Sequence, residues 1–214
     1  MGQQARYQSV TIPINTPYSS SIDLVFGETV VGVENDSGWD SADIQLQICR
    51  NPNLLMNLVT NGGFETNTTG WTVGGTNTLA SSATQAKFGT KSGLATAVGV
   101  FNAVFADYSV VADVITNEPY TVSAYVWIPT AYDGGGIALK QLNFTVGTSN
   151  TAADMALRDQ WQRLTLTFTP GADVVGNLQF VSTGGNPTAG LFFYIDGVQL
   201  ESGSTANTYI ETDG

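Results

Sequence analysis

The sequence predicts an all-β protein in which a small N-terminal β domain precedes a β-sandwich. Three observations carry this prediction. Short runs of alternating apolar and polar residues recur between Gly, Asn, Pro and Ser, which is typical of sandwich strands. No long stretch carries apolar residues at helical spacing. Only 12% of residues are charged, and abundant Thr, Ser and Asn keep a sheet surface hydrated without charge.

Eight segments have strand character. The clearest alternation places Leu164, Leu166 and Phe168 on one face of a strand and Thr165 and Thr167 on the other. Residues 153–158 could form either a short helical turn or a loop. The predicted strands are Ser9–Ile14, Thr29–Glu34, Ile44–Cys49, Tyr120–Ile128, Lys140–Val146, Arg163–Phe168, Val174–Val181 and Leu191–Leu200.

A domain boundary is expected near residues 50–58. Asn51-Pro52-Asn53 favours a turn, because Asn hydrogen-bonds its own backbone and Pro fixes φ. The apolar residues 54–56 that follow indicate a short, packed linker, since a mobile linker would be rich in Gly and Ser. We therefore predict a first domain over residues 1–56 and a second over residues 57–214.

Composition excludes several classes of function. Eighteen acidic and seven basic residues give a net charge of −11, so the surface repels the phosphates of nucleic acid. The absence of His excludes His-based metal sites and triads, and Cys49 alone cannot form a disulfide within one chain. No apolar run has the length of a signal segment or a membrane span, so we expect synthesis in a cytoplasm and no membrane partner.

An enzymatic role is not expected. A glycosidase needs two carboxylates facing each other across a cleft. The acidic residues of this chain are scattered at turns, and no pair stands out.

Local chemistry around residue 62 predicts a tight turn. Asn61-Gly62-Gly63 supplies the backbone freedom of such a turn, which directs Phe64 inward and Glu65 outward. Trp71, just past Gly70, is interpreted as a core aromatic residue.

Five segments, in this order, resemble the carbohydrate-binding-module families 4, 9 and 22. The resemblance covers roughly residues 57–210 and implies a jelly-roll β-sandwich and a glycan ligand. The segments are residues 57–65 with 69–72, residues 87–93, residues 120–127, residues 161–169 and residues 193–201.

This resemblance also implies a structural calcium ion. Its ligands would be Glu65 and Asp196, completed by backbone carbonyls, which together make a hard-oxygen cage. The alternative is that both acids hydrogen-bond backbone amides at strand ends.

Sugars stack their C–H bonds on aromatic rings, while polar side chains bind the hydroxyls. The candidate aromatic residues are Tyr125, Trp127 and Tyr132, with Gln141 and Asn143 as polar partners. Alternation places Tyr125 and Trp127 on one face, which is either a binding surface or the core. Tyr132 precedes Gly134-Gly135-Gly136 and is therefore expected in an exposed, flexible loop.

The N-terminal region has a resemblance of its own. Residues 19–24, 29–33 and 37–47 resemble a pattern of small tailed-phage virion domains. This implies a virion surface protein, most simply a capsid decoration or cement protein, whose partners are capsid or other virion proteins. We expect residues 1–56 to dock as a dimer or trimer. A tail or baseplate accessory protein, or a soluble glycan-binding module, recognising host surface polysaccharide, is the alternative.

Overall fold

The computed structural model describes residues 57–98, 104–110, 114–145, 147–171, 176–185 and 187–212. The chain divides into two units, residues 1–49 and 50–214, and every described residue belongs to the second. The three strands predicted before residue 50, Cys49 and the N-terminal docking unit therefore lie outside the described residues.

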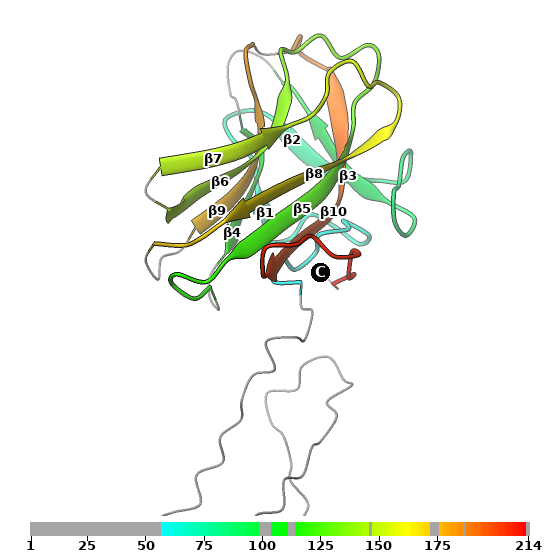
Figure 1. Ribbon diagram of the computed structural model, residues 1–214. Coiled ribbons are helices and arrows are strands. Elements are labelled where there is room, and N and C mark those ends of the chain that lie inside the picture. The colour runs from blue at the N-terminus through cyan, green and yellow to red at the C-terminus, as the bar shows by residue number, and fades with distance from the viewer. Residues whose placement is uncertain are drawn as a thin grey trace, which may run out of the picture. The chain divides into compact units, whose positions relative to one another are not determined.

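The described residues form a sandwich of two five-stranded antiparallel sheets (Figure 1). The first sheet has the order β1-β4-β9-β6-β7 and the second the order β2-β3-β10-β5-β8. The described part contains no helix, so none long enough to cross a membrane. The strands are β1 (Trp71–Thr72), β2 (Thr78–Ser82), β3 (Ser92–Thr96), β4 (Val104–Val110), β5 (Tyr120–Trp127), β6 (Ile137–Thr145), β7 (Gly147–Ala152), β8 (Trp161–Phe168), β9 (Gly176–Ser182) and β10 (Phe192–Ser202).

Alternation along the strands builds the core between the sheets. On β8, Leu164 and Phe168 are buried while the Thr residues between them are exposed, as predicted. Aromatic rings join the two layers: Phe105 of β4 meets Phe193 of β10 with ring centroids 5.0 Å apart. Full burial of such a side chain contributes about 1.5–3 kcal/mol. Core packing therefore holds the sheets face to face.

Five of the predicted strands correspond to β5, β6, β8, β9 and β10, with ends shifted by a few residues. Five other strands escape sequence reasoning. β1 has two residues, while β3 and β7 consist mainly of Gly, Ser, Thr, Ala and Asn. Such strands exist because a neighbouring strand completes their hydrogen bonds. Residues 153–158 adopt a loop with a turn, so the loop alternative is confirmed.

The two ends of the sandwich lie together. Figure 1 shows the C-terminal segment returning beside the start of the described chain. Asn57 makes this contact, because its Nδ2 group donates to the carbonyl of Ile210 at 3.1 Å. A single buried side chain thus fastens the first residue of the sandwich to its last segment.

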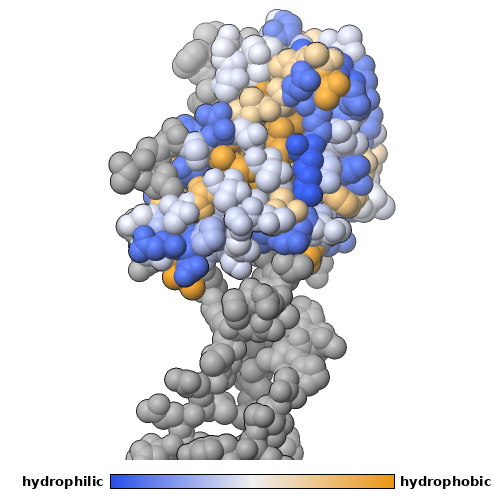
Figure 2. All heavy atoms as spheres, in the orientation of Figure 1, coloured by the Kyte–Doolittle hydropathy of each residue, from blue (hydrophilic) through white to orange (hydrophobic). Residues whose placement is uncertain are grey.

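Exposed aliphatic side chains are scattered. On the face shown in Figure 2, hydrophobic patches are small and separated by hydrophilic residues. The large aliphatic residues that the described part exposes are Val73, Val98, Ile115 and Leu157.

Candidate functional site

The turn around Gly62 sets the geometry of the first candidate site. Asn61 and Phe64 adopt positive φ, at 56° and 57°. The Gly62 carbonyl accepts a hydrogen bond of 2.9 Å from the backbone N–H of Val198. Phe64 is fully buried and its ring lies 5.1 Å from that of Trp71, also buried. The predicted inward direction of Phe64 and the core position of Trp71 are confirmed.

Asp196 lies on β10, where the register with β5 shifts between residues 196 and 199. Its Oδ2 accepts from the backbone N–H groups of Lys87, at 2.6 Å, and Phe88, at 3.0 Å. Its Oδ1 accepts from the N–H of Gly197 at 2.6 Å. Burial raises the pKa of Asp196 to about 6 and outweighs these amides, and the charge of Glu65 adds to the rise.

Glu65 reaches the same turn from the other end of the sandwich chain. Its carboxylate accepts from the Thr90 N–H, from the Thr90 hydroxyl at 2.8 Å and from the Lys91 N–H at 3.1 Å. Partial burial raises the pKa of Glu65, but these hydrogen bonds hold it below its ordinary value. A Cβ on Gly89, whose φ is +58°, would lie 2.2 Å from the Glu65 Oε1. Glycine at position 89 therefore leaves the space in which the Glu65 carboxylate lies.

Both acids thus converge on residues 87–91, and both hydrogen-bond backbone amides there. The alternative to a calcium ion was that both acids hydrogen-bond backbone amides, and the structure shows these hydrogen bonds. Among the described residues, no three Asp, Glu or Cys side chains gather in a group that could hold a metal ion. A calcium ion at these two acids would take its other oxygens from backbone carbonyls and water.

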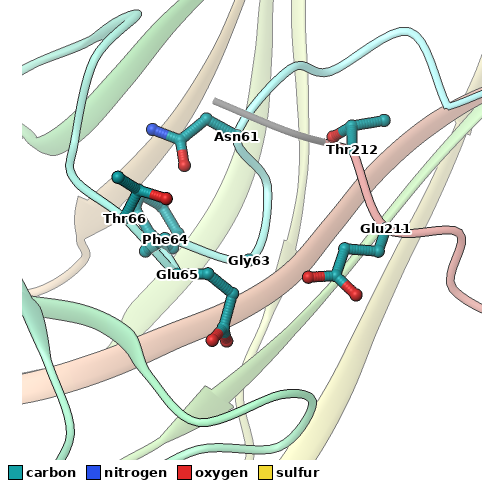
Figure 3. A pocket seen from close by; sticks show the side chains of 7 residues that line it. All are labelled: Asn61, Gly63, Phe64, Glu65, Thr66, Glu211 and Thr212. Atoms are coloured by element: carbon teal, nitrogen blue, oxygen red, sulfur yellow. The ribbon is translucent and has the colours of Figure 1, made fainter.

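A small hollow lies beside Glu65. Its lining residues include Glu65 and Glu211, which approach from two different segments of the chain (Figure 3). The nearby Tyr209 hydroxyl is buried and has no hydrogen-bond partner within the described part. Burial raises its pKa, and the charges of Asp196, Glu211 and Glu65 raise it further. The charge of this region therefore suits a cation, although its hydrogen bonds already stabilise the two carboxylates.

The structure decides which way Tyr125 and Trp127 face. Val122, Ala124 and Val126 of β5 fill the core, so Tyr125 and Trp127 point to the outer surface of the second sheet, where both are half-buried. The Trp127 ring rests on Tyr194 of β10, with centroids 5.6 Å apart and planes at 70°. The core alternative is wrong for these two residues.

The expected exposure of Tyr132 is also wrong. Only 2% of Tyr132 is exposed, and its ring packs against Phe193 with centroids 6.1 Å apart. Its N–H donates to the Pro129 carbonyl at 3.0 Å, so the loop turns back on itself. Gly134 permits this fold, since a Cβ there would lie 2.6 Å from the Tyr132 hydroxyl. Burial raises the pKa of that hydroxyl to about 12.

The two predicted polar partners lie on the other sheet. Gln141 alternates inward with Ile137 and Leu139 on β6, is fully buried, and donates to the Ser149 hydroxyl at 3.1 Å. Asn143 is exposed, with φ at 71°, but β6 belongs to the first sheet. The five candidate residues therefore do not form one cleft.

Two surface features were missed from the sequence. Trp161 and Arg163 on β8 lie opposite Trp127 and Tyr125, and only the strand register brings these pairs together. On the outer face of the first sheet, Asp107 accepts from the side-chain amides of Asn177 at 2.7 Å and Gln179 at 2.8 Å. Alternation in β9 is the signal that could have shown this polar face.

Comparison with solved structures places the sandwich among carbohydrate-binding modules by fold. The CBM22-1 xylan-binding domain of Paenibacillus barcinonensis Xyn10C superposes with a TM-score of 0.56 and 21% identity, covering 71% of this chain and 97% of that domain. The C-terminal family 22 module of Clostridium thermocellum Xyn10B gives 0.53 and 16% identity, covering 69% and 94%.

A phage protein shares the fold as well. The enzymatically active domain of bacteriophage CBA120 tailspike protein 4 gives a TM-score of 0.53 at 13% identity, covering 68% of this chain but 21% of that one. No curated protein sequence matches the chain. The sequence model of the carbohydrate binding domain family CBM_4_9 matches residues 56–189, which is more than half of the chain. The protein therefore belongs to this carbohydrate binding domain family.

Proposed function

We propose that the sandwich binds a polysaccharide on the outer face of its second sheet. The observation that carries the proposal is a pair of half-buried indole rings, Trp127 and Trp161, which lie beside Tyr125 at the edge of that sheet. Aromatic faces attract the C–H surface of a sugar ring, and half-burial fixes the rings before the ligand arrives. Membership of a carbohydrate binding domain family supports the same function.

Removing the central indole tests this site. Trp127→Ala is expected to weaken polysaccharide binding roughly tenfold, which corresponds to about 1.4 kcal/mol. Affinity electrophoresis or calorimetry on host-envelope polysaccharides measures the change. Lys140→Ala, on β6 of the first sheet and partly exposed, is the control. Loss of binding in Lys140→Ala with full binding in Trp127→Ala would move the ligand to the first sheet.

For the whole chain, we propose a non-enzymatic role on a phage virion, as a capsid decoration or cement protein with the sandwich exposed. The phage-like sequence pattern before residue 50 supports this location. A position on the tail or baseplate is the second candidate, and the tailspike that shares the sandwich fold favours it. In either place the N-terminal unit would dock as a dimer or trimer, and the sandwich would meet the host polysaccharide.

Particle binding separates these assignments. Particles lacking the protein are mixed with the full chain or with residues 57–214, each gold-labelled, and imaged. We expect the full chain to decorate heads and the fragment to remain unbound, as docking by residues 1–56 requires. Decoration by the fragment would contradict the docking role. Label confined to tails would establish the second candidate.

We further propose that calcium binds at Glu65 and Asp196, because two carboxylates meet there and one has a raised pKa. When bound, the ion would neutralise both charges and link the start of the sandwich to its last strand. Binding to the native state alone raises the apparent stability. EDTA is therefore expected to lower Tm, and Asp196→Asn to remove most of the difference. Equal melting curves with calcium and with EDTA would exclude a structural ion.

A further inference from the structure

Four side chains form a square on the outer face of the second sheet. Tyr125 and Trp127 come from β5, and Arg163 and Trp161 lie directly opposite them on β8. Facing side chains in an antiparallel pair have Cβ atoms about 4.5–5.5 Å apart. Alternate residues along a strand are about 7 Å apart. A sugar ring on the indoles therefore lies within reach of the groups around Tyr125.

Two cations gather at the Tyr125 corner of this square. The Lys87 Nζ lies 5.1 Å from the centroid of the Tyr125 ring, and the Arg163 Cζ lies 5.7 Å from it. The electron-rich face of the ring attracts both charges and holds them there. Tyr125 is thus a support for cations, whereas the indoles of Trp127 and Trp161 remain for stacking.

Lys87 and Arg163 both have hydrogen-bond donors that no group of the described part uses. Arg163 donates from Nη2 to the Ser123 hydroxyl at 3.1 Å and to the Asn207 carbonyl, which leaves its Nη1 and Nε donors. Within the described ranges, neither Lys87 nor Arg163 forms a salt bridge with a carboxylate, and both residues are exposed. A guanidinium with an open edge is suited to a carboxylate.

The nearest acidic side chains of the same face already accept hydrogen bonds from other protein groups. Asp196 lies opposite Tyr125 on β10, but it is buried and its oxygens accept three backbone amides. Glu201 is buried too and accepts from the Gln199 side-chain amide, from the Asn207 backbone N–H and from the Asn207 side-chain amide. Lys87 and Arg163 therefore present the exposed charge of this corner, in a protein whose net charge is −11.

We propose that this square selects acidic sugars: Trp127 and Trp161 stack the ring of a uronic acid, and Arg163, assisted by Lys87, binds its carboxylate. The inference rests on the proposed polysaccharide binding and names its ligand class. The charge-assisted hydrogen bond is expected to raise the affinity for the acidic sugar roughly tenfold. Because both partners are exposed, salt weakens the attraction.

A matched pair of ligands isolates the charge. The full-length protein is titrated with polygalacturonate and with the same polymer after full methyl esterification, which removes the charge and keeps the backbone. We expect the acid to bind roughly tenfold more tightly than the ester, and the difference to shrink at about 0.5 M NaCl. Arg163→Gln should abolish the preference and retain binding to the ester.

Two further variants keep the test decisive. Lys87→Gln changes an exposed side chain and should reduce the preference for the acid by a smaller factor. This variant still tests the inference if Arg163→Gln fails to fold. Lys140→Gln, on the outer face of the first sheet, should change nothing. Equal affinity for acid and ester, or an unchanged preference in both Arg163→Gln and Lys87→Gln, would overturn the inference. Binding to neutral polysaccharides alone would overturn it and leave the proposed function standing, whereas no binding to either class would remove both.

Discussion

Gly62→Ala is expected to destabilise the sandwich by about 3 kcal/mol or more, the upper end of the usual cost of overpacking. A Cβ on Gly62 would lie 2.1 Å from the Val198 carbonyl oxygen and 3.1 Å from its carbon. These are backbone atoms of a central strand, so no side-chain rotation can relieve the contact. The 2.9 Å hydrogen bond from the Val198 N–H to the Gly62 carbonyl would be lost as the segments separate.

Chemical denaturation of the full chain, followed by tryptophan fluorescence, measures this loss. The matched control is Gly171→Ala, because a Cβ there meets nothing within 4 Å and Gly171 has no positive φ. Its unfolding midpoint should equal that of the unchanged chain. A Gly62→Ala midpoint equal to that of the control would mean that the turn can move away from β10 at little cost.

Asn57→Ala is expected to cost about 3 kcal/mol, since it removes four hydrogen bonds at a site that is 9% exposed. The Asn57 amide donates to the carbonyls of Val198 and Ile210. Its oxygen accepts from the N–H groups of Val59 and Leu200 at 3.0 and 3.1 Å. Alanine replaces none of these partners, so buried backbone groups would be left unsatisfied.

The same substitution should loosen the C-terminal segment before the sandwich unfolds. Hydrogen exchange at the Ile210 amide, which donates to Gln199 at 2.7 Å, is expected to accelerate in Asn57→Ala. Asn150→Ala, at an exposed position on β7, is the control for loss of an asparagine. An unchanged melting curve together with unchanged exchange would show that water replaces the four bonds without cost.

Local pattern predicted the strands whose side chains alternate strongly. β8 and β5 were predictable because apolar residues repeat at every second position, and the core needs that spacing. β3 and β7 were not, because Gly, Ser, Thr and Ala carry no such signal. β3 becomes a strand by pairing with β10, which lies far along the chain. β7 becomes one by pairing with β6, its neighbour in sequence, although its own residues carry no alternation.

Site prediction failed where burial depends on contacts distant in sequence. Tyr132 follows a proline and precedes three glycines, a composition typical of an exposed loop. Yet Phe193, about sixty positions later, provides the surface on which its ring packs. Gln141 is polar and on a strand, but the alternation of β6 turns it inward with Leu139.

The all-β class, the inward direction of Phe64 and the core position of Trp71 could be predicted from the sequence, because turn chemistry and alternation are local properties. The outward direction of Tyr125 and Trp127, and the position of Arg163 and Trp161 beside them, follow from the packing and register of the two sheets. Because side chains alternate along a strand, the sequence specifies that Tyr125 and Trp127 share one face. Which face meets the core depends on the sheet packed against it, and that information lies in strands far along the chain.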